Sequence, residues 1–250
     1  MSAITTATRA NTIGAVLRRS VSINGPATAL VFEGRSWTYA QLDQAVNRVA
    51  HRLLGLGLAP GSRVATYGKN SDAYLILFLA CARAGLVHVP VNFALKGDEL
   101  SYLLEDSQSS VLVADNDLLP LVAEVQRAGR AASIRSVLPM FPGETDGPDA
   151  ESVLSSALAG DASPVDVEVG DDDLAQLLYT SGTTSQPKGA MMTQAALVHQ
   201  YLSCIIALDF TAADRPLIAM PLYHSAAMHV FAMPYLALGA RIRLMQRPDV

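Results

Sequence analysis

The chain has 250 residues, of which 50% are hydrophobic and 16% are charged, and its formal net charge is −5. This composition is typical of a globular protein and excludes intrinsic disorder, while the acidic balance excludes a strongly basic nucleic-acid-binding surface. The polar stretch from Met1 to Thr12 lacks a signal-peptide core, and the apolar run from Tyr74 to Ala82 is too short to span a bilayer. Cys81 and Cys204 show no pairing pattern, so we expect reduced cysteines and a cytoplasmic location.

Apolar periodicity and turn residues predict alternating helices and strands in the first part of the chain. Glu33 and Gly34 predict a hairpin turn, and Thr38 with Gln41 predicts a capping box at the start of a long helix. Asp117 is expected to cap a later helix. The predicted helices cover residues 13–22, 38–53, 72–84, 98–106 and 117–127, and the predicted strands cover 29–32, 36–38, 63–67, 86–91, 111–114 and 137–138.

Two stretches without apolar periodicity, residues 140–150 and 160–173, are predicted to be surface connections. Strands alternating with helices imply βαβ units, so the predicted fold class is α/β, with mainly parallel sheets flanked by helices. We expect two approximate subregions, residues 1–170 and 171–250. After the second connection, the predicted elements are strands over 174–179, 217–220 and 240–244, and helices over 193–208 and 226–238.

Five consecutive small or hydroxylated residues follow the predicted strand 174–179 and precede Pro187, Lys188 and Gly189. Glycine lets backbone N–H groups approach an anion, hydroxyls add donors, and lysine adds a positive charge. A phosphate-binding loop is therefore predicted at the carboxyl end of a strand and before a helix, where open α/β sheets bind ligands. A polar surface loop is the alternative, and the pattern differs from a Walker A loop because proline precedes the lysine. The five residues are Thr180, Ser181, Gly182, Thr183 and Thr184.

The string from Tyr179 to Gly189 closely resembles the signature loop of the adenylate-forming superfamily. That superfamily includes acyl-CoA synthetases, coumarate-CoA ligases, luciferases and peptide-synthetase adenylation domains. Ser185 stands where the family usually has glycine. Segments 38–53, 57–71 and 84–107 also resemble the N-terminal part of the family.

The resemblance covers almost all of residues 1–250 but only the N-terminal part of an AMP-binding domain. Relative to the family's large N-terminal domain, the predicted fold is incomplete. The family's later motifs, which contact adenine, ribose and Mg²⁺, and its mobile C-terminal domain have no counterpart in this sequence. We therefore expect a fragment or truncated form.

A second segment, Pro221 to Met228, reads PLYHSAAM and is similar to the family's Pro-Leu-Phe-His motif at the acyl site. The resemblance implies that His224 is a catalytic residue that positions the acid or the acyl-adenylate. A hydrogen-bonded core histidine is the alternative. His224 and His229 are five residues apart and no His-Glu-x-x-His motif occurs, so no metal site is expected. The implied substrate-binding residues are Tyr223, Ala226, Ala227 and Met228.

The resemblance implies an acid–thiol ligase with ATP, Mg²⁺ and coenzyme A as cofactors. A carboxylic acid, with a fatty acid as the first candidate, would react with ATP to give acyl-adenylate and pyrophosphate, and the thiol of coenzyme A would then displace AMP. The loop 180–184 would hold the β- and γ-phosphates, and Lys188 would be either an auxiliary cation or a solvated surface lysine.

Two alternatives to a CoA ligase remain open. One is a non-catalytic fragment that binds a nucleotide or an acyl group, and the other is an acyl-AMP ligase that donates to a carrier protein. We expect weak or no activity from this chain alone, no nucleic-acid partner and no transmembrane segment. Sheet edges left exposed by truncation would favour a homo-oligomer.

Overall fold

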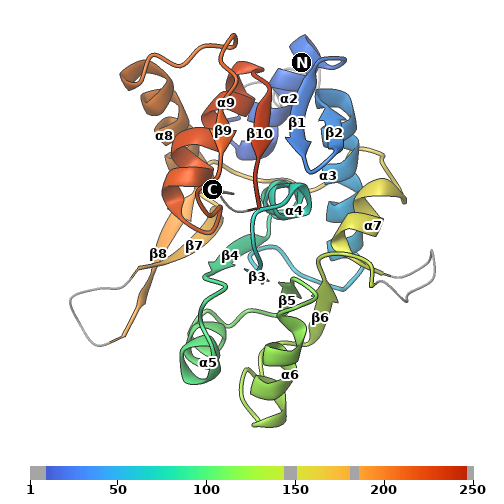
Figure 1. Cartoon of the computed structure of the whole chain (residues 1–250), viewed down its shortest axis with the longest axis vertical. Coiled ribbons are helices and arrows are strands. Elements are labelled where there is room, and N and C mark those ends of the chain that lie inside the picture. Colours follow the sequence, from blue (N-terminus) through green and yellow to red (C-terminus); the bar gives the residue numbers. More distant parts are fainter. Residues whose placement is uncertain (1–9, 144–150, 181–185, 247–250) are drawn as a thin grey trace.

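The computed structural model describes residues 10–143, 151–180 and 186–246, and within them the chain forms two sheets (Figure 1). The larger sheet has six strands in the order β6-β5-β3-β4-β7-β8. Its strands are β3 (Arg63–Tyr67), β4 (Val87–Val91), β5 (Val111–Ala114), β6 (Ser136–Pro139), β7 (Leu174–Thr180) and β8 (Lys188–Thr193). The smaller sheet has the order β2-β1-β10-β9. Its strands are β1 (Thr28–Phe32), β2 (Arg35–Thr38), β9 (Leu217–Ile218) and β10 (Ile242–Leu244).

Both sheets are mainly parallel, which confirms the predicted α/β class. The antiparallel pairs are β1–β2 and β7–β8. In the β1–β2 hairpin, Glu33 and Gly34 have φ values of 40° and 83°, as the predicted turn requires. The pairs β4–β7 and β1–β10 join strands from either side of residue 170. The division into subregions 1–170 and 171–250 stays a prediction.

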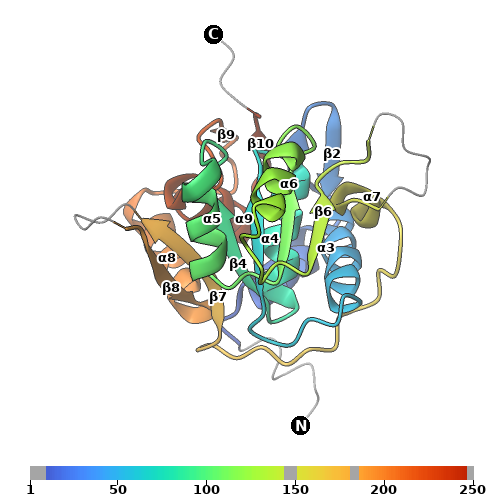
Figure 2. The same ribbon diagram turned by 90° about the horizontal axis from the view of Figure 1, so that it is seen from below.

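Helices cover both faces of the larger sheet. Along β3, Val64 packs with the helices between the two sheets, whereas Ala65 packs with α5 and α6 on the opposite face (Figure 2). This alternation is the period-two pattern of a strand buried on both faces. The helices are α2 (Ile13–Asn24), α3 (Tyr39–Leu54), α4 (Asp72–Arg83), α5 (Gly97–Asp106), α6 (Leu119–Arg127), α7 (Val153–Leu158), α8 (Gln194–Ala207), the π-helix η1 (Ala226–Ala232) and α9 (Met233–Leu238).

Helix α4 lies in the middle of the fold, and all twelve of its residues are buried. Its first residue, Asp72, accepts hydrogen bonds from Nε of Arg35 at 2.7 Å and from Nε1 of Trp37 at 2.9 Å. Both partners lie on β2, so a buried carboxylate joins α4 to the smaller sheet. A negative charge at a helix N-terminus also complements the helix dipole.

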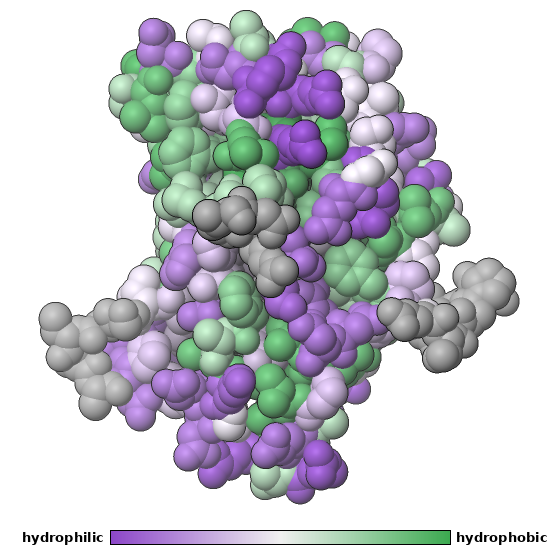
Figure 3. Space-filling model, in the orientation of Figure 1, coloured by the Kyte–Doolittle hydropathy of each residue, from purple (hydrophilic) through white to green (hydrophobic). Residues whose placement is uncertain are grey.

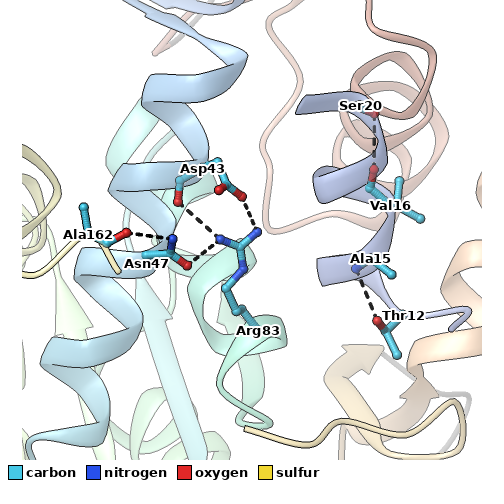
Figure 4. A network of polar contacts seen from close by, with 8 residues as sticks. All are labelled: Thr12, Ala15, Val16, Ser20, Asp43, Asn47, Arg83 and Ala162. Atoms are coloured by element: carbon cyan, nitrogen blue, oxygen red, sulfur yellow. Dashed lines mark hydrogen bonds and ion pairs between the residues drawn. The ribbon is translucent and has the colours of Figure 1, made fainter. Parts of the chain in front are cut away.

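The other end of α4 carries a buried cation, Arg83, whose exposed fraction is 6%. Its guanidinium donates to Oδ1 of Asp43 at 2.6 Å and to Oδ1 of Asn47 at 2.7 Å, and both acceptors lie on α3 (Figure 4). Asn47 in turn donates to the carbonyl oxygen of Ala162 at 3.0 Å. This network fixes α3 and the segment after α7 against the C-terminal end of α4.

Most predicted elements are confirmed, including the capping box of Thr38 and Gln41, but Asp117 does not cap a helix. Helix α6 begins after Leu118 without a side-chain cap, and proline in its first turn suits that start. Asp117 instead forms an ion pair with Lys69, which follows β3.

Three further elements differ from the prediction, one of which is the unpredicted strand β8. The short helix α7 was not predicted, because it has only six residues and rests on a local capping box between Ser152 and Ser155. The predicted helix over 226–238 is a π-helix followed by α9. Pro234 has no N–H to donate to the carbonyl four residues earlier, which accounts for a departure from α-helical bonding there.

Part of helix α8 presents apolar side chains to solvent. Leu202 and Ile206 are 52% and 81% exposed, and Figure 3 shows apolar residues gathered over this region at the upper left. Such a surface is typical of an interface, and the predicted homo-oligomer stays a prediction. Within the described ranges, no helix has the length and apolar character needed to cross a membrane. Both cysteines are buried and free.

We predict that Asp72→Ala lowers the free energy of unfolding by about 3 kcal/mol, because it leaves the Arg35 guanidinium and the Trp37 N–H without their buried acceptor. Urea unfolding measures the change. The matched control is Asp98→Ala, which breaks the exposed ion pair with Arg130 and is expected to have little effect. Equal losses in the two variants would contradict the role assigned to Asp72.

Candidate functional site

The predicted phosphate loop connects two antiparallel strands. Thr180 ends β7, Lys188 begins β8, and the two residues are register partners across the hairpin. Both side chains are exposed. Helix α8 follows the loop as predicted, but the unpredicted strand β8 lies between them, because residues 188–193 pair back along β7 before α8 begins. Four predicted phosphate-binding residues lie outside the described residues: Ser181, Gly182, Thr183 and Thr184.

Helix α5 holds the hairpin on both sides of the loop. The hydroxyl of Tyr179 donates to the carboxylate of Asp106 at 2.6 Å, and the hydroxyl of Tyr102 donates to the carbonyl oxygen of Pro187 at 3.0 Å. Burial and the Asp106 carboxylate raise the pKa of Tyr179, so its hydroxyl stays protonated and remains a donor. A Cβ at Gly189 would lie 3.2 Å from Cζ of Tyr179, so glycine allows β8 to approach that ring.

The segment before His224 is fixed by Asn70, which follows β3 and is 2% exposed. Its Oδ1 accepts from the backbone N–H of Leu222 at 2.7 Å. Its Nδ2 donates to the carbonyl oxygens of Met220 at 2.9 Å and Met245 at 3.0 Å. One amide side chain thereby brings the ends of β3, β9 and β10 together.

Tyr223 and His224 lie at the same edge of the larger sheet. The ring of Tyr223 meets Phe93, just after β4, with centroids 5.4 Å apart, and it lies 4.3 Å from the ring of His224. Burial raises the pKa of Tyr223. His224 is exposed, so the alternative of a buried core histidine does not apply to it.

The three predicted acyl-site residues at the start of η1 differ in exposure. Ala226 is exposed, whereas Ala227 and Met228 have no exposed surface and belong to the core between the two sheets. The structure thus places Ala226 beside the exposed His224 segment and the other two behind it. The assignment of these residues to an acyl tunnel stays a prediction.

A buried polar network joins the strand that carries the loop to the helix that follows His224. Nε2 of His229 donates to Oε1 of Gln176 at 2.8 Å, and Nε2 of Gln176 donates to Nδ1 of His88 at 3.0 Å. The hydroxyl of Tyr201 donates to Nδ1 of His229 at 3.1 Å. We assign these directions because each neutral imidazole has one donor and one acceptor nitrogen.

Sequence reasoning missed this network, although one signal was available. Gln176 is a polar residue inside an otherwise apolar strand, and it is 1% exposed. Burial lowers the pKa of both His88 and His229 to about 3, so both imidazoles are neutral near pH 7. Gln176 is four residues before Thr180, which makes the network the direct connection between the two predicted site segments.

Another missed group is Asp115, which follows β5 at the same sheet edge. Its carboxylate accepts from the backbone N–H of Lys69 at 2.8 Å, and burial raises its pKa to about 6. A Cβ at position 68 would lie 2.8 Å from Oδ1 of Asp115, so any larger residue there would have to displace this carboxylate. Within the described part of the chain, Oδ1 of Asp115 and the hydroxyl of Tyr74 are buried without hydrogen-bond partners.

No metal-ligand set is formed by the residues that the structure describes. Among them, no three His, Cys, Asp or Glu side chains lie close enough together to hold a metal ion. The chemistry that the described residues offer is hydrogen bonding and one lysine charge beside the loop.

The family model described as "AMP-binding enzyme" matches residues 17–250. The chain belongs to this AMP-binding enzyme family. A feruloyl-CoA synthase from Amycolatopsis is 37% identical over 226 residues, which are 90% of this chain and 42% of that protein. A fatty acid–[acyl-carrier-protein] ligase, ScoC, from Streptomyces coeruleorubidus is 37% identical over 78% of this chain and 36% of that protein. The chain thus spans less than half the length of these relatives.

Solved structures of this family have the same fold. The N-terminal domain of FACL13 from Mycobacterium tuberculosis superposes with a TM-score of 0.85 at 30% identity, over 95% of this chain and 58% of that one. ATP-bound MatB from Rhodopseudomonas palustris superposes with a TM-score of 0.83 at 29% identity, over 96% of this chain and 46% of that one. The architecture described above is therefore the N-terminal portion of a known ligase fold.

We predict that Gln176→Leu destabilises the fold, because it leaves Nε2 of His229 and Nδ1 of His88 buried without partners. Each unpaired group costs about 1–3 kcal/mol. Urea unfolding measures the change, with Gln44→Leu on the exposed face of α3 as the matched control. A variant as stable as the control would show that the network contributes no net stability.

The buried histidines also predict how stability depends on pH. Their folded pKa of about 3 lies below the ordinary value of 6.5, so the unfolded chain binds more protons between these values and stability falls as the pH falls. Asp115 has the opposite effect. Because its folded pKa is raised from 3.8 to about 6, the folded chain binds more protons in that range, and this group adds stability as the pH falls. We expect His229→Gln to reduce the slope of unfolding free energy against pH by about 1.4 kcal/mol per pH unit between pH 4 and 6. Urea titrations at several pH values measure it, and an unchanged slope would contradict the neutral, buried state of His229.

Proposed function

We propose that this chain provides the ATP-phosphate and acyl-carboxylate sites of an acyl-CoA synthetase, which activates a hydrophobic carboxylic acid as its adenylate in the cytoplasm. The observation that carries the proposal is the exposed pair of Thr180 and Lys188 on either side of the signature loop. The family membership and the ATP-bound relative support it.

Each loop residue has a defined role in this proposal. Thr180, Ser181, Gly182, Thr183 and Thr184 bind the β- and γ-phosphates through hydroxyl and backbone N–H donors, and Lys188 adds a positive charge from the opposite strand. Anchoring of the hairpin by Tyr102 and Asp106 supports such a role, because donors that are already positioned stabilise developing charge without reorganisation.

The acid occupies the sheet edge beside His224. The exposed imidazole of His224 orients the carboxylate or the acyl-adenylate, and the rings of Tyr223 and Phe93 form an aromatic wall next to it. Ala226, Ala227 and Met228 limit the space behind that wall. Coenzyme A is the proposed acceptor of the acyl group, as the name of the feruloyl-CoA synthase relative suggests.

Three observations support alternatives for the kind of acid and for the reaction. A fatty acid and an aryl acid both suit an aromatic wall, and the two relatives named above act on one of each kind. The carrier-protein ligase among them supports an acyl-AMP ligase as the second candidate. The partial coverage of the relatives supports the third, a fragment that binds ATP or the acyl group without catalysis.

We predict that the purified chain binds ATP and shows weak or no ATP–pyrophosphate exchange with pooled fatty and aryl acids. The double variant Thr183→Ala, Thr184→Ala should weaken ATP binding at least tenfold, because it removes two hydroxyl donors from the loop. Calorimetry measures binding, and incorporation of labelled pyrophosphate into ATP measures the exchange.

A second lysine serves as the matched control for this experiment. Lys188→Ala should weaken ATP binding, whereas Lys96→Ala, at the start of α5, should leave it unchanged. Failure of the unmodified chain to bind ATP, or equal binding by all variants, would contradict the proposed phosphate site. Rapid exchange abolished by the double variant would instead show that the chain completes adenylation by itself.

A further inference from the structure

A second candidate site lies at the opposite edge of the larger sheet. A cavity of about 950 Å³ is lined by the segments that precede β3, β4, β5 and β6 and by the start of β7. The proposed ATP and acyl sites lie after the carboxyl ends of these parallel strands, at Asn70, Phe93 and Thr180. The cavity is therefore separate from them and has no role in the proposed function.

Three polar residues form a row across the floor of this cavity. The backbone N–H of Ser110 donates to the carbonyl oxygen of Arg63 at 2.9 Å. The backbone N–H of Arg135 donates to the carbonyl oxygen of Ser110 at 2.8 Å. These two hydrogen bonds continue the parallel register of β3, β5 and β6 by one residue. The side chains of Arg63, Ser110 and Arg135 therefore lie on the same face of the sheet. Neighbouring strands are about 4.8 Å apart, so the two arginines bracket the serine hydroxyl from about 10 Å across.

Neither arginine forms an ion pair with a residue that the structure describes. Nε of Arg63 is buried and has no hydrogen-bond partner in the described part of the chain. Arg135, in contrast, is exposed to solvent at the end of the row. By contrast, Arg35, Arg83 and Arg130 are each paired with an aspartate. A buried donor without an acceptor is costly, so an oxyanion in the cavity that accepts from Nε of Arg63 would remove that cost.

The far side of the cavity carries the opposite charge. Glu168 and Asp173, before β7, line that side, and the carboxylate of Asp173 accepts from the backbone N–H of Gly170 at 2.8 Å. An anion is therefore favoured only over the row of Arg63, Ser110 and Arg135. The carboxylates repel a second negative charge, which limits the ligand to one anionic group on the arginine side.

We propose that Arg63, Ser110 and Arg135 form a binding site for the oxyanion of a small molecule, either a carboxylate or a phosphate monoester. Planar guanidinium groups bind such oxygens with two parallel N–H donors, and Nε of Arg63 supplies one donor that is already desolvated. The hydroxyl of Ser110 completes the set between the two cations.

The test is an NMR titration of the whole chain, labelled at arginine Nε, with inorganic phosphate and separately with acetate. Either probe should shift the Arg63 Nε–H signal in a saturable way. Arg135→Gln should weaken that binding at least tenfold, and Ser110→Ala should weaken it by a smaller factor. Arg130→Gln, which removes an exposed arginine outside the cavity lining, should leave it unchanged.

Two further comparisons identify the preferred oxyanion and separate this site from the proposed ATP site. Stronger binding of phosphate or of acetate identifies the kind of oxyanion that the site prefers. Lys188→Ala should leave the Arg63 shift intact, because Lys188 belongs to the loop at the other edge of the sheet. The proposal is overturned if neither probe shifts Arg63 saturably, if Arg135→Gln binds as the unmodified chain does, or if the shift depends on Lys188.

Discussion

The arrangement of both sheets depends on how the buried helix α4 satisfies the charges at its two ends. A helix that is buried on every side has no water at its termini, so each end needs an internal partner. Asp72 meets Arg35 and Trp37 of β2 at one end, and Arg83 meets Asp43 and Asn47 of α3 at the other. Each charge lies at the end of the helix where the dipole favours it. The two ion pairs orient α4, and α4 sets the spacing between the sheets.

The position of the candidate site follows from that orientation. Asn70 comes two residues before Asp72, and its side chain holds the segment before His224 and the end of β10. Phe78, in the middle of α4, packs edge-on against both His88 and His229, so the same helix also supports the buried polar network. The segment before His224 is thus tied to the residues that lead into α4, and the buried network that joins β7 to η1 packs against the same helix.

Local patterns predicted most of the fold because its strands and helices are bounded by strong turn signals. The predicted bounds of the strands 63–67 and 111–114 agree with β3 and β5, which are apolar runs between turns. Strand β8 was missed because its pairing with β7 is a tertiary preference that overrides the loop-like composition around Pro187. The network of Gln176 joins residues 53 and 88 positions apart, a distance at which no periodicity in the sequence carries information. The sequence predicted correctly that Thr180 and His224 lie at or after the ends of strands, but not which alanines of η1 are exposed.

Strand β7 shows how one short segment serves both the core and the site. Its register with β8 shifts between Leu174 and Gln176, and this irregularity interrupts the normal alternation of faces. Ala175 packs with the core between the sheets and Leu177 with the α5–α6 side, while Gln176 reaches His88 and His229. Beyond Tyr179 the strand leaves the core, and its exposed end at Thr180 begins the loop. The buried half of the strand is thus held by hydrogen bonds as well as by packing, and the loop begins at the end of this anchored strand. A phosphate-binding loop on a hairpin needs such an anchor, since an antiparallel pair at the edge of a sheet has neighbours on one side only.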